Sequence, residues 1–267
     1  CSICCRAARF NLPDGWTEHM SIWGKVIGGV AGFALGGPLG ALIGAYAGHK
    51  MDQARTGEGA RVGPGGYDQQ SRQVAFTMAV IVLSAKMAKA DGVVSREEVL
   101  AFKQIFHIPS DEMASVGKLF DEARKDASGF EPYAEQVAQM FAHEPAVLEE
   151  LIGGLFHIAL ADGVIHPAEM DFLAKVSIIF GFSERDFERL RASYDTPETS
   201  SPYEVLGVDP DADDADVKKA YRKLLVVNHP DKLIAQGLPQ EFIDLANEKM
   251  AAINAAYDTI KKQRGMG

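Results

Sequence analysis

The hydrophobic positions divide the chain into four parts with different patterns. Residues 26–48 contain no charged side chain, and residues 49–72 form a glycine-rich linker. Residues 73–193 repeat apolar side chains at the spacing of helices, and residues 201–264 carry shorter helical patterns. No stretch alternates apolar and polar residues as a half-buried strand does. The sequence therefore predicts an all-α protein.

The uncharged segment is long enough to cross a bilayer. Its twenty-three residues, at about 1.5 Å each, give a helix of roughly 34 Å. The hydrocarbon core of a bilayer is about 30 Å thick. A glycine-rich soluble loop or an amphipathic surface helix is the alternative, but the segment has no charged face. We therefore expect a single transmembrane helix over residues 24–48.

Glycine recurs at every fourth position of this expected helix. Small residues in such a row let two backbones approach closely in lipid. Four residues slightly exceed one helical turn, so the row winds around the axis, and Pro38 favours a kink. The sequence thus predicts a glycine zipper that holds a homodimer together. Its members are Gly24, Gly28, Gly32, Gly36, Gly40, Gly44 and Gly48.

The charges beside the segment predict its orientation. Residues 1–19 are expected to be an extension of the gene model, with translation starting at Met20, or a short non-cytoplasmic tail. By the positive-inside rule, the side with more Lys and Arg lies in the cytoplasm. Here that is the C-terminal side, which carries Lys50, Arg55 and Arg61, against Lys25 before the span.

The middle region contains an internal duplication. The sequence Ala-Asp-Gly-Val at residues 90–93 returns at residues 161–164, each time between two apolar helical patterns. Gly92 and Gly163 suit turns with positive φ, and Pro167 suits the first turn of the helix that follows. We therefore predict two similar helix–turn–helix units within residues 73–193.

These turns superficially resemble calcium-binding EF-hand loops. With each glycine at loop position six, the first and third ligand positions fall on Met87 and Lys89, or on Ile158 and Leu160. Those side chains have no oxygen to offer a hard cation. The turns are therefore interpreted as structural, with no metal site. The region instead resembles the TerB family of helical domains, first named from tellurite-resistance proteins.

Basic residues cluster on one predicted helix near the C-terminus. Val217, Ala220, Tyr221 and Leu224 follow a helical spacing along its apolar face. The tripeptide His229-Pro230-Asp231 comes directly after, and its proline cannot continue the helix. The pattern indicates a positively charged rod that ends in a rigid polar corner, a shape suited to an acidic partner surface.

This region resembles the J domain of DnaJ-type co-chaperones. Tyr203-Glu204-Val205-Leu206-Gly207 matches the first helix of that family, and Asn254-Ala255-Ala256-Tyr257 matches the end of its third helix. The resemblance implies a helical hairpin that binds a DnaK-type chaperone and stimulates its ATPase. It implies the partner-binding residues His229, Pro230, Asp231, Lys218, Lys219, Tyr221, Arg222 and Lys223.

The charge and cysteine content of the chain limit the classes of partner and site that we expect. The formal net charge is −10 with a pI near 5.2, which argues against nucleic acid as a partner. The three cysteines lie within the first five residues, so they cannot support a disulfide framework or a cysteine metal site in the folded regions. No phosphate-binding loop or nucleophile–base pair stands out, so we expect neither an enzyme nor a cofactor.

The order of the parts resembles that of membrane-anchored type III J-proteins, which lack a zinc module. The resemblance implies a bacterial inner-membrane protein with its C-terminal domains in the cytoplasm. Two alternatives remain open. The chain could be a membrane adaptor or stress-signalling protein that acts mainly through the TerB-like domain, or a metal-dependent enzyme of the kind that the TerB name suggests.

Overall fold

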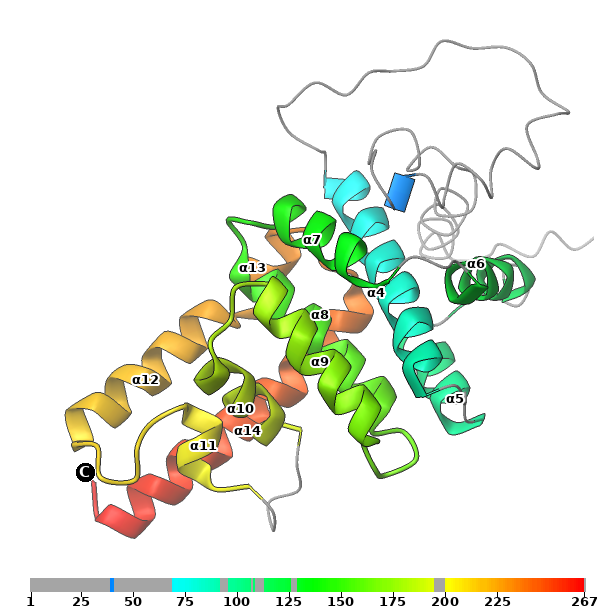
Figure 1. Cartoon of the computed structure of the whole chain (residues 1–267). Coiled ribbons are helices and arrows are strands. Elements are labelled where there is room, and N and C mark those ends of the chain that lie inside the picture. The colour runs from blue at the N-terminus through cyan, green and yellow to red at the C-terminus, as the bar shows by residue number, and fades with distance from the viewer. Residues whose placement is uncertain are drawn as a thin grey trace, which may run out of the picture.

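All regular structure in the described residues is helical, which confirms the all-α prediction for that part of the chain (Figure 1). The computed structural model describes residues 39–40, 69–91, 96–106, 108, 113–125, 129–194 and 200–266.

The TerB-like region is built around two buried helices, α4 and α8. Every residue from Val74 to Ala88 in α4 is buried, and so are nearly all residues of α8. A helix that is apolar all round belongs in a core. The described helices of this region are α4 (Gln69–Asp91), α5 (Arg96–Phe106), α6 (Met113–Lys125), α7 (Glu131–Met140), α8 (Pro145–Ala159), α9 (Pro167–Ile179) and α10 (Glu184–Ala192).

The predicted duplication has a counterpart in the packing. The pair α4–α5 and the pair α8–α9 pack crosswise, with α5 against α8 and α9 against α4. In the second turn Gly163 has a φ of +90°, and Asp162 Oδ1 accepts a hydrogen bond from Val164 N at 3.0 Å. Helix α9 begins at Pro167, as its sequence predicted. The first turn, residues 92–95, lies outside the described residues.

The J region contains four helices. They are α11 (Pro202–Leu206), α12 (Asp214–Val227), α13 (Pro230–Ala235) and α14 (Gln240–Arg264). Ser201 Oγ caps α11 through Tyr203 N at 3.3 Å, and Gly207 ends it with a φ of +63°. At the other end, Arg264 donates to Tyr203 Oη at 3.0 Å and to the carbonyl of Ala212 at 2.6 Å.

Helix α14 belongs to two hydrophobic cores, so the predicted J-domain hairpin shares one of its helices with the TerB-like region. Its second half, with Ile253 and Ile260, packs with α11 and α12. Its first half, with Phe242 and Ala246, is part of the TerB-like core. Figure 1 shows α14 running from behind α8 past α10 and α11 to the C-terminus. The apolar face of α14 is long enough to serve both cores.

Helix α4 also starts earlier than expected. It begins at Gln69, so its first turn overlaps the predicted linker 49–72. Arg72 and Gln73 in this turn bond to the loop between α13 and α14, at Gln236 O (3.2 Å) and Leu238 O (3.5 Å). Contacts with a distant part of the chain thus hold a turn whose own sequence is polar.

The predicted membrane segment lies almost wholly outside the described residues. Of the glycine row only Gly40 is described, in a short helical piece with Leu39. Leu39 is buried, and its backbone N–H donates to Gln136 Oε1 on α7 at 2.9 Å. Among the described helices, none has both the length and the apolar character needed to span a bilayer.

Candidate partner-binding surface

The tripeptide forms the joint between α12 and α13. Helix α12 ends at Val227, Asn228 closes it, and Pro230 opens α13. The corner is therefore tighter than the sequence indicated, because the proline starts a new helix at once. Asn228 is fully buried and donates from Nδ2 to the carbonyl of Leu224 at 2.9 Å.

His229 caps the new helix with its own ring. Its Nδ1 accepts a hydrogen bond from Asp231 N at 3.2 Å, while the Asp231 carboxylate lies farther away, at 3.9 Å. An accepting Nδ1 has no proton, so the neutral ring carries its proton on Nε2. The side chain is 57% exposed and that of Asp231 is 89% exposed. The tripeptide therefore offers a donor and a carboxylate to the outside.

The basic residues of α12 lie on and beside its exposed face. Lys219, Arg222 and Lys223 are exposed, and Lys218 is half-buried. Lys223 also acts on Asp186 of α10. Burial raises the pKa of the Asp186 carboxyl, but hydrogen bonds from Ser183, together with Arg189 and Lys223, bring it below its usual value.

Tyr221 has contacts inside the J region that the sequence did not indicate. Its ring stacks on Tyr257 of α14 with centroids 3.9 Å apart, and its hydroxyl donates to Asn254 Oδ1 at 3.0 Å. The half-buried ring thus ties α12 to α14. Its role as a partner contact stays a prediction.

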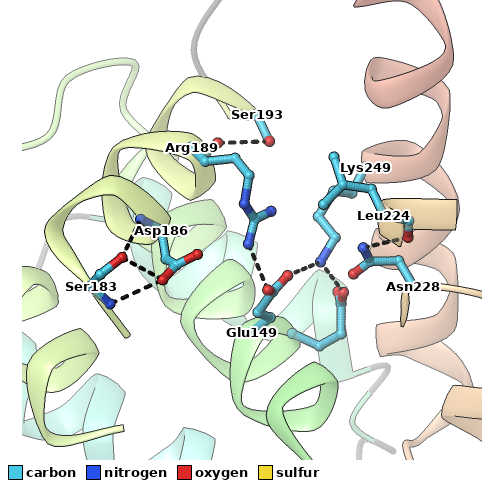
Figure 2. Close-up of polar contacts among 9 residues, drawn as sticks. Glu149, Ser183, Asp186, Arg189, Ser193, Leu224, Asn228 and Lys249 are labelled. Atoms are coloured by element: carbon cyan, nitrogen blue, oxygen red, sulfur yellow. Dashed lines mark hydrogen bonds and ion pairs between the residues drawn. The ribbon is translucent and has the colours of Figure 1, made fainter. Parts of the chain in front are cut away.

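A buried charge cluster joins α8, α10 and α14, and sequence reasoning missed it. Lys249 Nζ of α14 donates to Glu150 Oε1 and, at 3.4 Å, to Glu149 Oε2. Arg189 Nη2 of α10 donates to Glu149 Oε1 at 2.6 Å (Figure 2). Glu150 and the Lys249 side chain are fully buried, and Glu149 and Arg189 nearly so. The only sequence signal was the adjacent carboxylates within an otherwise apolar helix.

Burial also shifts the pKa of Glu150 in this cluster and that of the neighbouring Tyr194. Desolvation raises the pKa of Glu150, although Lys249 opposes the rise. Desolvation likewise raises the pKa of the Tyr194 phenol well above its ordinary value, and the nearby Glu150 adds to the effect. Among the described residues, Glu150 Oε2 and Tyr194 Oη have no hydrogen-bond partner.

Of the two duplicated turns, the second lies within the described residues. In the described residues, no group of three or more His, Cys, Asp or Glu side chains could hold a metal ion. Near the second turn, Glu169 is committed to the start of α9, because its Oε2 accepts from His166 N at 2.9 Å.

Family profiles match three successive parts of the chain. Residues 20–64 match the family described as the co-chaperone DjlA transmembrane domain, residues 77–192 match tellurite resistance protein TerB, and residues 201–265 match the DnaJ domain. No solved structure shows significant similarity to the chain.

Similar whole proteins are described as the co-chaperone protein DjlA. The chain is 32% identical to the co-chaperone protein DjlA of Photobacterium profundum, over 91% of this chain and 99% of that protein. It is 34% identical to DjlA of Shewanella oneidensis (92% and 100%) and 31% identical to DjlA of Coxiella burnetii (91% and 98%). With its J domain, TerB-like domain and matched transmembrane region in the same order, the chain belongs to the DjlA family of J-domain co-chaperones.

Proposed function

We propose that this co-chaperone binds a DnaK-type chaperone through its J domain and stimulates the ATPase of that chaperone. The observation that carries the proposal is the exposed tripeptide His229-Pro230-Asp231 at the end of a basic helix. The chain itself performs no bond chemistry in this proposal. The enzyme is the partner chaperone, whose ATP hydrolysis this protein stimulates by binding.

The basic face of α12 supplies the first step, which is encounter. The protein as a whole has a net charge of −10, whereas Lys219, Arg222 and Lys223 form a positively charged patch on α12. Such a patch steers an acidic partner surface toward α12 and speeds association. Steering between exposed charges weakens as salt is added.

The tripeptide supplies the second step. Pro230 fixes the backbone angle at the corner, and the ring cap holds His229 in place, so the Nε2 donor and the Asp231 carboxylate are presented together. A preorganised donor and acceptor lose little freedom when a partner binds. We expect them to contact the partner at the site that controls its ATPase.

Two substitutions of His229 test this step. His229→Gln should abolish stimulation of the partner's ATPase in single-turnover assays, with the melting curve almost unchanged, because the side chain is exposed. His229→Asn keeps a good helix cap but lacks the Nε2 donor, so it should be equally inactive. If His229→Asn stimulates normally, the ring serves only as a cap. If His229→Gln stimulates like the parent, the proposal is wrong.

A charge-reversal pair tests the steering. Arg222→Glu should weaken binding, and most strongly at low salt. Lys262→Glu makes the same change of charge on the exposed end of α14 and is the matched control. Equal effects of both variants would mean that net charge, and not the face of α12, governs association.

We further propose that the glycine-zipper segment anchors the protein as a homodimer in the bacterial inner membrane, with both folded domains in the cytoplasm. The match of residues 20–64 to a transmembrane family supports the anchor. The basic residues after the segment support the orientation. A DnaK-type partner and its ATP would meet the J domain on that side.

The alternative is an adaptor that acts mainly through the TerB-like domain. Deleting the J domain cannot separate the two functions, since Phe242 and Ala246 of α14 complete the TerB-like core. His229→Gln in the full chain can. An adaptor would keep its cellular phenotype with this variant, whereas a co-chaperone would lose it.

A further inference from the structure

The two domains share an aromatic contact. Phe242 of α14 lies edge-on to Phe76 of α4, with ring centroids 4.6 Å apart, and 5.7 Å from the ring of Phe106. Gly154 of α8 faces the same ring. A Cβ added at Gly154 would come within 2.5 Å of Phe242 Cε1. The J helix α14 is therefore seated directly on the backbone of α8.

The buried charges fix α14 along its length. Lys249 lies on the face of α14 that meets α8, where both carboxylates of Glu149 and Glu150 receive it. Arg189 reaches Glu149 from α10, and its aliphatic stem lies against Gly207 of α11. A buried cation is tolerated only where its partners stand in place. Sliding or tilting α14 would separate Lys249 from both carboxylates.

A second connection holds the loop that follows the tripeptide helix. Arg72 of α4 donates from Nε to Gln236 O at 3.2 Å and pairs through Nη2 with Glu144. Its guanidinium also lies 5.7 Å from the centre of the Phe141 ring. One side chain thus joins the first turn of α4, the start of α8 and the end of α13.

We propose that the TerB-like domain holds the J domain in one fixed orientation, an arrangement that we call the mount. In this arrangement the J domain does not swing on a tether, because its orientation is fixed by α14 and by the loop after α13. Arg72 and Lys249 act as positioning residues for the tripeptide. In this fixed arrangement His229 and Asp231 are exposed, so the partner-binding surface is accessible.

Interdomain distances in the full chain test the mount without reference to any partner. Spin labels go on the exposed positions Glu135 (α7) and Ala215 (α12), with the native cysteines replaced by serine and the protein diluted with unlabelled copies. Pulsed electron resonance should give one narrow distance distribution for the parent. A broad distribution for the parent would overturn the proposal at once.

A glycine pair then tests the contact itself. Gly154→Leu places a side chain against Phe242 and should broaden the Glu135–Ala215 distribution. Gly117→Leu is the control, because an added Cβ meets nothing within 4 Å there. Labels at Ala215 and Asp258, both within the J domain, should stay narrow throughout. An unchanged interdomain distribution in folded Gly154→Leu would refute the mount.

The effect on activity rests on the proposed function and uses a milder variant. Arg72→Ala should raise the concentration for half-maximal ATPase stimulation roughly two- to tenfold, and leave the maximal rate unchanged. Arg124→Ala removes an arginine of α6 that pairs with Asp121 of the same helix, and should change neither value. If the parent protein does not stimulate the ATPase at all, the proposed function is wrong. The spin-label distances would still test whether the J domain has a fixed orientation. If the parent stimulates and Arg72→Ala matches it, Arg72 is not a positioning residue.

Discussion

Replacing Lys249 by Met should destabilise both domains together. The substitution keeps the length of the side chain and removes its charge. Of the two carboxylates, Arg189 pairs with Glu149 and not with Glu150. Glu150 would be left without a cation, and it is fully buried. Removing one partner of a buried pair is far more costly than removing both.

The expected loss in the free energy of unfolding for Lys249→Met follows from two limits. Breaking a buried ion pair from one side costs about 3–5 kcal/mol. Glu150 can escape part of this cost by taking up a proton. For a carboxyl with an ordinary pKa near 4.3, neutralisation at pH 7 costs about 1.4 kcal/mol per unit, or roughly 3.7 kcal/mol. We therefore expect a loss of about 3–4 kcal/mol in the free energy of unfolding at pH 7.

The pH dependence has a definite sign. Burial already raises the folded pKa of Glu150, and loss of Lys249 removes the main opposing influence, so the pKa rises further in the variant. A raised folded pKa gives stability that is fully present below the unfolded value and is lost as pH rises through the folded value. The variant should therefore recover relative to the parent by up to about 1.4 kcal/mol per pH unit as pH falls from 7 toward 5.

Urea unfolding of the full chain, followed by circular dichroism, measures these differences as a double-mutant cycle. Glu150→Gln removes the uncompensated charge, so the double variant Glu150→Gln/Lys249→Met should regain about 2–3 kcal/mol relative to Lys249→Met. A loss below 1 kcal/mol for Lys249→Met, or strictly additive effects, would show that the cluster does not hold α14 in place.

Four other outcomes follow from the sequence and the fold. Carbonate extraction should leave the full chain in the membrane pellet, and its release would contradict the predicted anchor. Gly36→Leu should lower crosslinked dimer yields by blocking close backbone approach, and an unchanged yield would exclude that interface. Calorimetric titration of the full chain with calcium should show no saturable heat in the micromolar range, since Ile158 and Leu160 offer no oxygen ligands at the second turn. Arg264→Ala should lower stability by about 1–3 kcal/mol in thermal melts, because it removes hydrogen bonds to Tyr203, Ala212 and Pro210. A melt like that of the parent would show that these bonds do not stabilise the fold.

Local signals in the sequence were sufficient to predict the helical architecture. Pro167 starts α9 and Gly207 ends α11, because both residues act within their own turn. The corner at His229-Pro230-Asp231 was visible for the same reason, although the ring cap on Asp231 N depends on a rotamer that sequence does not specify.

Contacts between distant segments could not be predicted in this way. Lys249 and Arg189 look like ordinary exposed helix charges, and only the approach of α14 to α8 buries them. Phe242 lies within residues 201–264 of the J region, yet it packs on Phe76 of α4. A single sequence shows which face of a helix is apolar, but it does not show which other element covers that face. For that reason the interface between the domains was missed.

Helix α14 also has a consequence for synthesis of the chain. A domain usually folds once its own residues have left the ribosome. Here the TerB-like helices end at Ala192, but Phe242 and Ala246, which fill their core, are translated about 50 residues later. At about 5–20 residues per second, the aromatic side chains of α4 and α5 wait several seconds for their last partner. During that interval the faces of Phe76 and Phe106 that Phe242 later covers have no partner from α14, so we expect chaperones to bind the nascent protein there.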